Sequence, residues 1–137
     1  ICDFCRNSGQ GVPNSEGAII RCALESLALR YREVLATLES LIDSTIQTIH
    51  IVGGGTQNEL LCQMTADACN RQVLAGPVEA TAIGNVMMQS LADGDVASIT
   101  QARELIRKSF PLRQYEPHEP ARWDEAFSRY QTLIKNN

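Results

Sequence analysis

The chain has 137 residues, 44% of them hydrophobic, with a formal net charge of −4 and a sequence pI near 5.1. This length suits one domain with a core, and an acidic chain has no basic field to hold nucleic acid or anionic lipid. Because no apolar stretch approaches the roughly 20 residues of a membrane span and no signal-peptide pattern is visible, we expect a cytoplasmic protein without nucleic-acid or membrane partners.

Residues 1–15 are predicted to be an entry segment, in which Cys2 and Cys5 form a C-x-x-C pair. This spacing is compatible with zinc or with thiol exchange, but a structural zinc site needs four ligands and no second pair has similar spacing. Five cysteines are an odd number in an acidic chain, which favours reduced thiols. Three other cysteines occupy apolar helix positions and are predicted to be small buried hydrophobes: Cys22, Cys62 and Cys69.

A long helix is predicted over residues 16–42, with Ser15 or Asn14 as its N-cap. Its apolar stripe runs close to a 3.5-residue period: Ile20, Leu24, Leu27, Tyr31, Val34, Leu35, Leu38 and Leu41. The stripe lacks the flanking charge pattern of a coiled coil, so we expect this helix to lie on a sheet.

A strand is predicted over residues 46–52, followed by three glycines and a helix over residues 56–69. A glycine turn can adopt positive φ and bring backbone N–H groups close to a ligand. The N-terminus of the following helix would add its own free N–H groups and its positive dipole end. This arrangement is typical of one half of a nucleotide site.

A second strand-helix pair follows. Asn70 is the predicted C-cap, residues 72–75 a strand, Gly76 and Pro77 a turn, and residues 78–91 a helix containing small residues. The order predicts a right-handed parallel crossover, with ligands beyond the carboxyl ends of the strands. Because two strands are few for a sheet, we expect one open sheet edge.

The remaining residues are predicted to form a helical tail. It comprises a short helix over 98–108, an extended proline-containing connection over 110–120, and a final helix over 119–134. The final helix carries an aromatic and aliphatic stripe that we interpret as packing and not as a base-stacking platform: Trp123, Phe127, Tyr130 and Ile134.

The turn at residues 53–55 does not match either of two general glycine-rich nucleotide-binding motifs. The dinucleotide pattern needs glycine where Asn58 stands, and the P-loop needs a Lys-Ser/Thr pair that residues 56–59 do not supply. Neither a Rossmann dehydrogenase nor a P-loop enzyme is therefore supported.

The surrounding sequence resembles the carboxy-terminal domain of FGGY-type carbohydrate kinases. The resemblance is most specific in G-G-G-T-Q-N-E-L-L-C-Q-M-T-A-D-A-C at 53–69 and R-Q-V-L-A-G-P-V-E-A-T-A-I-G-N at 71–85. Within the family it is greatest to the L-rhamnulose kinases, supported by F-C-R-N-S-G-Q-G-V-P at 4–13 and S-L-A-L-R-Y at 26–31. It covers nearly the whole chain and is weakest after residue 94.

The resemblance implies an α/β fold: part of an actin-like, ribonuclease H-like lobe, with a parallel strand-helix-strand crossover packed with several helices. It also implies ATP and Mg²⁺ as cofactors and a cofactor-binding set formed by the glycine turn and the residues after it: Gly53, Gly54, Gly55, Gln57 and Asn58. Gly54 is the first choice for the contact with the adenosine and α-phosphate. Capping is an equal alternative for Asn58 and the better one for Thr56. Residues 79–84 are expected to support the adenine pocket from behind.

In such kinases an aspartate deprotonates the sugar hydroxyl, and no aspartate here stands in the matching motif, so no catalytic or metal-binding residue is assigned. We expect residues 1–137 to be the later part of the ATP-binding lobe, with a nucleotide-binding unit at 16–94 and the tail at 95–137. The chain by itself would be inactive, and L-rhamnulose would bind mainly to the missing lobe. Three alternatives remain: another FGGY pentulose or hexulose kinase, a non-catalytic nucleotide-binding or regulatory module, and a crossover unit without any ligand.

Overall fold

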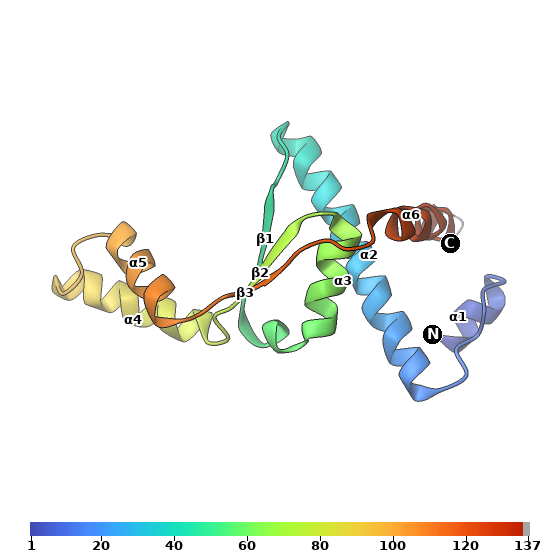
Figure 1. The fold of residues 1–137 in the computed structure, drawn as a ribbon, viewed down its shortest axis with the longest axis horizontal. Helices are drawn as coiled ribbons and strands as arrows, with labels where there is room; N and C mark the ends of the chain where they lie inside the picture. The colour runs from blue at the N-terminus through green and yellow to red at the C-terminus, as the bar shows by residue number, and fades with distance from the viewer. Residues whose placement is uncertain (136–137) are drawn as a thin grey trace.

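A computed structural model of the chain describes residues 1–135. Figure 1 shows three small strands at the centre, a long helix behind them, and a helical arm on the left. The elements in chain order are α1 (Cys2–Asn7), α2 (Glu16–Ile42), β1 (Thr48–Ile51), the 3₁₀ helix η1 (Gly53–Gln57), α3 (Glu59–Cys69), β2 (Gln72–Ala75), α4 (Ala80–Asp93), α5 (Ile99–Ser109), β3 (Arg113–Tyr115) and α6 (Pro120–Lys135).

The sheet has the order β1-β2-β3. β1 and β2 are parallel, with Thr48 opposite Gln72, and they are joined by the predicted crossover through α3. β3 runs antiparallel to β2, with Val73 opposite Tyr115. Within residues 1–135, β1 pairs only with β2, so the predicted open edge of the sheet is confirmed.

The elements agree with the sequence predictions to different degrees. α2 and β2 have the predicted bounds, and the capping residues are also as predicted: the Ser15 hydroxyl accepts a hydrogen bond from the Ala18 N–H, and Asn70 ends α3 in the left-handed conformation. β1 is shorter than the strand predicted over 46–52. The connection predicted over 110–120 contains the unpredicted strand β3.

The main core lies between α3 and the sheet. Cys62 and Ala66 of α3 pack on Val73 and Ala75 of β2, and all four are buried. Ile49, Ile51 and Tyr115 pack around them from the two outer strands. Small α3 residues therefore allow the helix to lie close to the sheet and to fix where the strands end.

α2 packs on α3 and not directly on the sheet. Ala28 of α2 forms a second buried cluster with Met64 and Ala68 of α3. The prediction that α2 lies on a sheet is wrong, because the small residue at position 28 fits against α3. Several members of its apolar stripe are consequently exposed: Ile20, Leu27, Tyr31, Val34, Leu38 and Leu41.

Three residues of the stripe predicted for the final helix pack against the rest of the chain, whereas the fourth, Ile134, is exposed. Trp123 of α6 is partly buried against the cluster formed by α2 and α3. The rings of Phe127 and Tyr130 stack with centroids 6.1 Å apart, and the Arg32 guanidinium lies 4.5 Å from the centroid of the Phe127 ring. These aromatic side chains hold α6 on α2 and are not available as a stacking platform.

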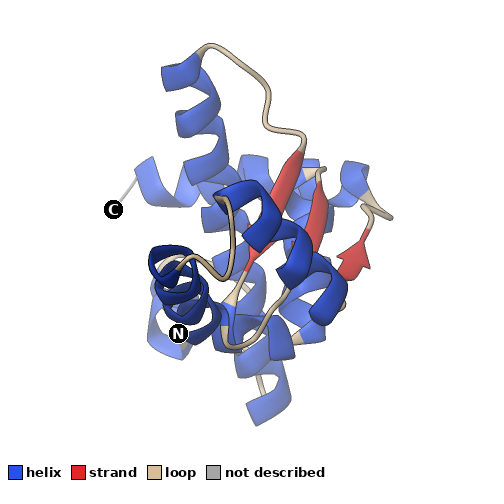
Figure 2. Cartoon of the chain, turned by 90° about the vertical axis from the view of Figure 1, so that its left-hand side faces the viewer, coloured by secondary structure: helices blue, strands red, loops and turns tan. Residues whose placement is uncertain are grey.

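Helices α4 and α5 form the arm on the left of Figure 1, and Figure 2 views the sheet from the side of this arm. The chain leaves the sheet at the end of β2 and returns to it at the start of β3. α4 has no buried residue, and a Cβ placed on Gly84 would meet no atom within 4 Å. The close helix packing expected from the small residues of α4 is therefore not found at Gly84.

Cys62 and Cys69 are buried, as predicted for small hydrophobes, whereas Cys22 is only half-buried. Burial raises the pKa of Cys69 to about 11, so its thiol stays protonated near neutral pH. Among residues 1–135, no helix is long and apolar enough to cross a membrane, and no group of three or more His, Cys, Asp and Glu side chains could hold a metal ion.

Glu39 joins the end of α2 to the starts of both parallel strands. Its carboxylate accepts hydrogen bonds from the Ile46 N–H at 2.9 Å and from Arg71 Nη2 at 3.0 Å. Arg71 Nε also donates to the Ile46 carbonyl at 2.7 Å. The Ile46 amide, and after it the Arg71 guanidinium, lower the pKa of Glu39 below its ordinary value.

We expect the stability lost in Glu39→Gln to depend on pH. Because the folded-state pKa is lowered, the stabilisation is fully present above the unfolded-state value of 4.5 and is lost as pH falls through the folded-state pKa. Urea midpoints of the two proteins should therefore differ at pH 7 and converge in acid. Glu104→Gln removes an exposed carboxylate of α5 as a control. A Glu39→Gln difference that stays constant with pH would contradict this account.

Candidate functional site

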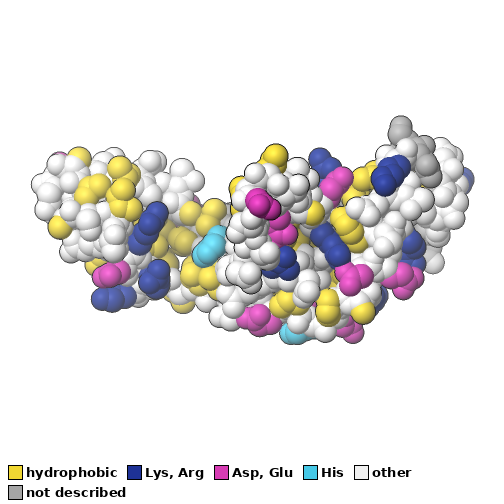
Figure 3. Space-filling model, turned by 90° about the horizontal axis from the view of Figure 1, so that it is seen from above, with side chains coloured by type: hydrophobic (Ala, Val, Ile, Leu, Met, Phe, Trp, Pro, Cys, Tyr) yellow, Lys and Arg dark blue, Asp and Glu magenta, His cyan; other side chains and the backbone are white. Residues whose placement is uncertain are grey.

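A cavity of about 560 Å³ lies beyond the carboxyl ends of the strands, at the base of the α4–α5 arm. Figure 3 shows hydrophobic side chains gathered where the arm meets the rest of the molecule. The lining comes from three segments that are separate in sequence: Thr56 and Gln57; Ala75, Gly76, Pro77, Val78, Glu79 and Ile83; and Phe110, Pro111 and Arg113. Most of these residues are apolar, and polar groups stand at a few positions, as in pockets that hold small molecules.

Two backbone hydrogen bonds fix the loops that follow β1 and β2. The Gly76 N–H donates to the Ile51 carbonyl at 2.9 Å, and the Gly53 N–H donates to the Pro77 carbonyl at 3.1 Å. These bonds continue the pairing of the parallel strands past their ends. The glycine turn and the Gly76 turn therefore have a fixed position relative to each other.

The three glycines form the start of a 3₁₀ helix and not an open loop. Gly53 has φ +76°, a conformation that favours glycine, and the Thr56 hydroxyl donates to the Gly53 carbonyl at 2.7 Å. Thr56 is buried, so it closes this turn and does not cap α3. Gly54 has no positive φ, and a Cβ there would meet no atom within 4 Å.

Asn58 is the N-cap of α3. Its side-chain oxygen accepts a hydrogen bond from the Leu61 N–H at 3.0 Å. Gln57 and Asn58 both precede α3, so their predicted placement on the first turn of that helix is wrong. The cause is the 3₁₀ turn, which uses five residues before the α-helix can begin.

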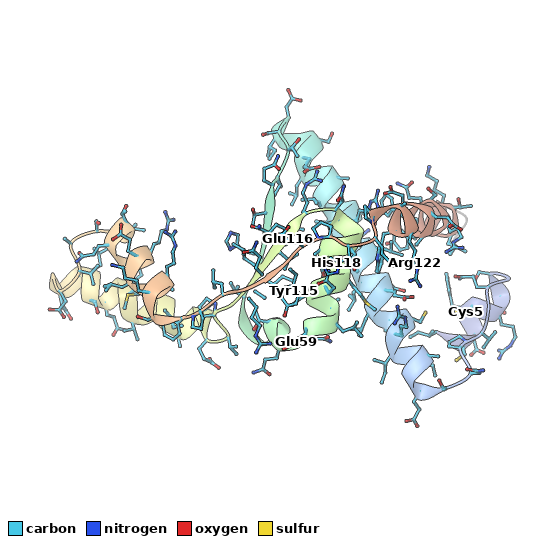
Figure 4. All side chains as sticks on the ribbon, viewed as in Figure 1. Cys5, Glu59, Tyr115, Glu116, His118 and Arg122 are labelled. Carbon is cyan, nitrogen blue, oxygen red and sulfur yellow. The ribbon has the colours of Figure 1, made fainter. Side chains whose placement is uncertain are left out.

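A charged pair stands beside the cavity. The Arg113 guanidinium of β3 forms an ion pair with the Glu59 carboxylate, the first residue of α3, and both side chains are largely exposed. Figure 4 marks Glu59 at the lower end of α3. Arg113 also lines the cavity. An anionic group entering from this side would meet both a cation and the carboxylate paired with it.

The profile of the FGGY family of carbohydrate kinases, C-terminal domain, matches residues 2–92. The chain belongs to the FGGY family. Rhamnulokinase of Bacteroides thetaiotaomicron is 47% identical over 135 residues, which cover 98% of this chain and 28% of that protein. Rhamnulokinase of Bacillus subtilis is 38% identical, over 96% of this chain and 27% of that protein.

The solved structure of xylulose kinase from Rhodospirillum rubrum has the same fold. It is superimposed with a TM-score of 0.64 at 22% sequence identity, over 93% of this chain and 26% of that chain. The predicted α/β fold class is thereby confirmed. This FGGY chain spans just over a quarter of the length of the curated relatives it matches.

The structure places the sequence-predicted residues of this FGGY domain in and next to the cavity. Gln57 lines it directly, whereas the three glycines and Asn58 lie in the adjoining turn and do not line it. Glu79 and Ile83 also line the cavity, so the segment at 79–84 reaches it directly and not only from behind.

Sequence reasoning missed one wall of the cavity. Phe110, Pro111 and Arg113 come from the segment that returns from the arm to the sheet. The sequence shows Phe-Pro directly after an amphipathic helix, but this pattern does not predict which earlier segment of the chain it contacts. Only the antiparallel pairing of β3 with β2 brings this wall to the Gly76 turn.

Proposed function

We propose that this FGGY domain supplies the adenosine-binding part of an ATP-dependent sugar kinase. The adenine would lie in the 560 Å³ cavity, with the ribose and α-phosphate beside the glycine turn. Gly53, Gly54, Gly55, Gln57 and Asn58 remain the proposed contact residues, and Phe110 and Arg113 are added to them. The observation that carries the proposal is the position of the cavity beyond two parallel strand ends, where α/β sheets bind ligands.

The character of the cavity supports an adenine ligand. The apolar lining residues offer surfaces for a flat ring, and the Gln57 amide offers hydrogen-bonding groups for ring nitrogens or ribose hydroxyls. Arg113 is the cationic residue among those that line the cavity. Because Arg113 is paired with Glu59, a nucleotide phosphate would either share the Arg113 guanidinium with the Glu59 carboxylate or displace that carboxylate from it.

We propose no magnesium-binding residue within this chain. Among the residues described, no cluster of acidic or histidine side chains is suited to a metal. Magnesium in phosphoryl transfer is held by the phosphates and one or two carboxylates, and we assign no such carboxylate here. Asp67, on the helix after the glycines, accepts hydrogen bonds from Gln63 and from the His118 N–H. This carboxylate has a packing role and is not the proposed base.

The proposed reaction is transfer of the ATP γ-phosphoryl group to a ketose. The names of the relatives favour L-rhamnulose, which would become L-rhamnulose 1-phosphate. Another pentulose or hexulose is the second substrate candidate, and a non-catalytic nucleotide-binding module is the alternative class. Because the sugar site and the catalytic base are assigned to segments beyond this chain, the chain by itself should not catalyse the reaction.

Titration of the 137-residue chain with ADP tests the nucleotide assignment. We expect millimolar affinity, on the order of −4 kcal/mol, because only part of the contacts is available to offset the costs of association. Amide resonances of residues 53–58 and 76–79 should shift in nuclear magnetic resonance spectra, and those around Trp123 should not. Gln57→Leu should weaken the shifts, whereas Gln131→Leu on exposed α6 should leave them unchanged.

Two outcomes would contradict the assignment. Shifts centred on Trp123 would move the pocket to the α2–α6 side, and micromolar binding would mean that the chain already contains a complete site. The same preparation should show no ATP-dependent phosphorylation of L-rhamnulose above buffer. Turnover that follows the purified chain would place a catalytic base within these residues.

A further inference from the structure

One ion pair joins α3 to β3 at the edge of the cavity beyond the strand ends. The Glu59 carboxylate, on the first residue of α3, pairs with the guanidinium of Arg113, on the first residue of β3, and the two residues are 54 positions apart in sequence. Arg113 lines the cavity and stands opposite Ala75 in the sheet, which lines it too. The cationic member of the pair therefore faces the site proposed for the nucleotide.

This ion pair is far more exposed than the one that joins α2 to the start of β2. The side chains of Arg113 and Glu59 are 61% and 67% exposed, whereas those of Arg71 and Glu39 are each 23% exposed. Exposed ion pairs contribute little to stability because water and salt screen both charges. The Glu59 side chain can therefore turn away from Arg113 into water at small cost.

The pair lies on the side of the cavity that the proposed placement gives to the phosphates. Gln57 ends the glycine turn and lines the cavity, and Glu59 follows it by two residues. While the pair is closed, its two charges offset each other toward an incoming anion. A phosphate and a carboxylate held on one guanidinium would also repel each other, which favours displacement of Glu59 over sharing of Arg113.

We propose that Glu59 is an intramolecular competitor of the nucleotide phosphate for Arg113, and that this pair sets the preference of the cavity for phosphorylated nucleotides over adenosine. The inference rests on the proposed function of the cavity. Arg113 holds the phosphate through charge-assisted hydrogen bonds once Glu59 has turned away. Glu59 acts only through Arg113, so it is a positioning residue.

Parallel titrations of the 137-residue chain with adenosine and with magnesium-free ADP, at constant ionic strength, measure this preference as the ratio of the adenosine Kd to the ADP Kd. Arg113→Gln should lower the ratio about fivefold, and Glu59→Gln should raise it about threefold, the size expected for exposed charge pairs. The adenosine Kd should stay the same in both variants. Glu119→Gln opens the exposed Arg122–Glu119 pair instead and should leave the ratio unchanged.

The double variant Glu59→Gln/Arg113→Gln separates competition for Arg113 from a general loss of negative charge. If Glu59 acts through Arg113, its substitution should have almost no further effect on the ADP Kd once Arg113 is gone. The Arg113 Nε–Hε resonance, assigned by its absence from the Arg113→Gln spectrum, should shift with ADP well beyond its shift with adenosine. Circular dichroism verifies that the variants are folded.

Two results would overturn this inference while the adenosine site stands. One is the same ratio in the wild-type and Arg113→Gln proteins, and the other is an equal gain in ADP affinity from Glu59→Gln with and without Arg113. Failure of the proposed function has a different signature, because adenosine would then leave the amide resonances of residues 53–58 and 76–79 of the wild-type protein in place. In that case the role proposed for Glu59 is overturned together with the site.

Discussion

Gly76→Ala is expected to lower the free energy of unfolding by about 2–3 kcal/mol, the range for a non-glycine residue held in a strained backbone region. Gly76 has φ +126°, which side-chain-bearing residues rarely adopt. A Cβ there would also lie 3.3 Å from Leu112 Cδ2 and 3.5 Å from the Pro111 carbonyl oxygen. Since the Gly76 N–H bonds to β1 and the crowding comes from the segment leading into β3, the change would disturb all three strands.

Gly54→Ala is the matched control for this prediction. Gly54 lies in the neighbouring turn, has no positive φ, and would place its Cβ in open space. Its effect should stay within about 0.5 kcal/mol, as for ordinary surface substitutions. Urea denaturation of both variants, followed by circular dichroism, measures the difference. Equal stabilities of the two variants would show that the Gly76 turn tolerates a side chain and is not the close contact described.

Helices and the buried strand β2 could be predicted well from the sequence because their signals are local. The cap at Ser15 and the apolar stripe fixed the bounds of α2, and the left-handed Asn70 marked the end of α3. The packing partner of α2 could not be predicted in this way. A stripe shows which face is apolar, but not whether a sheet or another helix will cover it.

The strand β3 lacked a local signal. Arg113, Gln114 and Tyr115 form a three-residue strand in which two residues are exposed, flanked by prolines at 111 and 117. Such a segment becomes a strand only because β2 offers it a free edge, so its structure is decided by tertiary contact. The same pairing forms one wall of the cavity, which explains why that wall was missed.

The position of the glycine turn was predicted from the sequence, but its conformation was not. Strand-glycine-helix order correctly indicated a turn at the carboxyl end of β1, which the structure places beside the cavity. The 3₁₀ turn depends on the Thr56 hydroxyl folding back to Gly53, and this contact has no distinctive sequence pattern. Asn58 fits both a cap and a ligand contact by residue type alone, and the structure shows the cap.

A substitution at Gly54 tests nucleotide binding most directly, because the space around this residue is open. In a full-length kinase that contains this segment, Gly54→Val should raise the Michaelis constant for ATP by about tenfold or more, equivalent to about 1.4 kcal/mol or more of lost binding. The Michaelis constant for the sugar should change little. The reason is that the added side chain meets no protein atom within 4 Å and would occupy the space assigned to the nucleotide.

Gly17→Val provides the control for this substitution. Gly17 also has open space around it, but it lies in the first turn of α2 and does not line the cavity. Steady-state kinetics with ATP and sugar varied separately distinguish the two variants, and thermal unfolding verifies that both are folded. If folded Gly54→Val protein keeps the wild-type Michaelis constant for ATP, the nucleotide does not contact the glycine turn. If both Michaelis constants rise together, the substitution acts on the shape of the whole lobe and not on the adenosine contact.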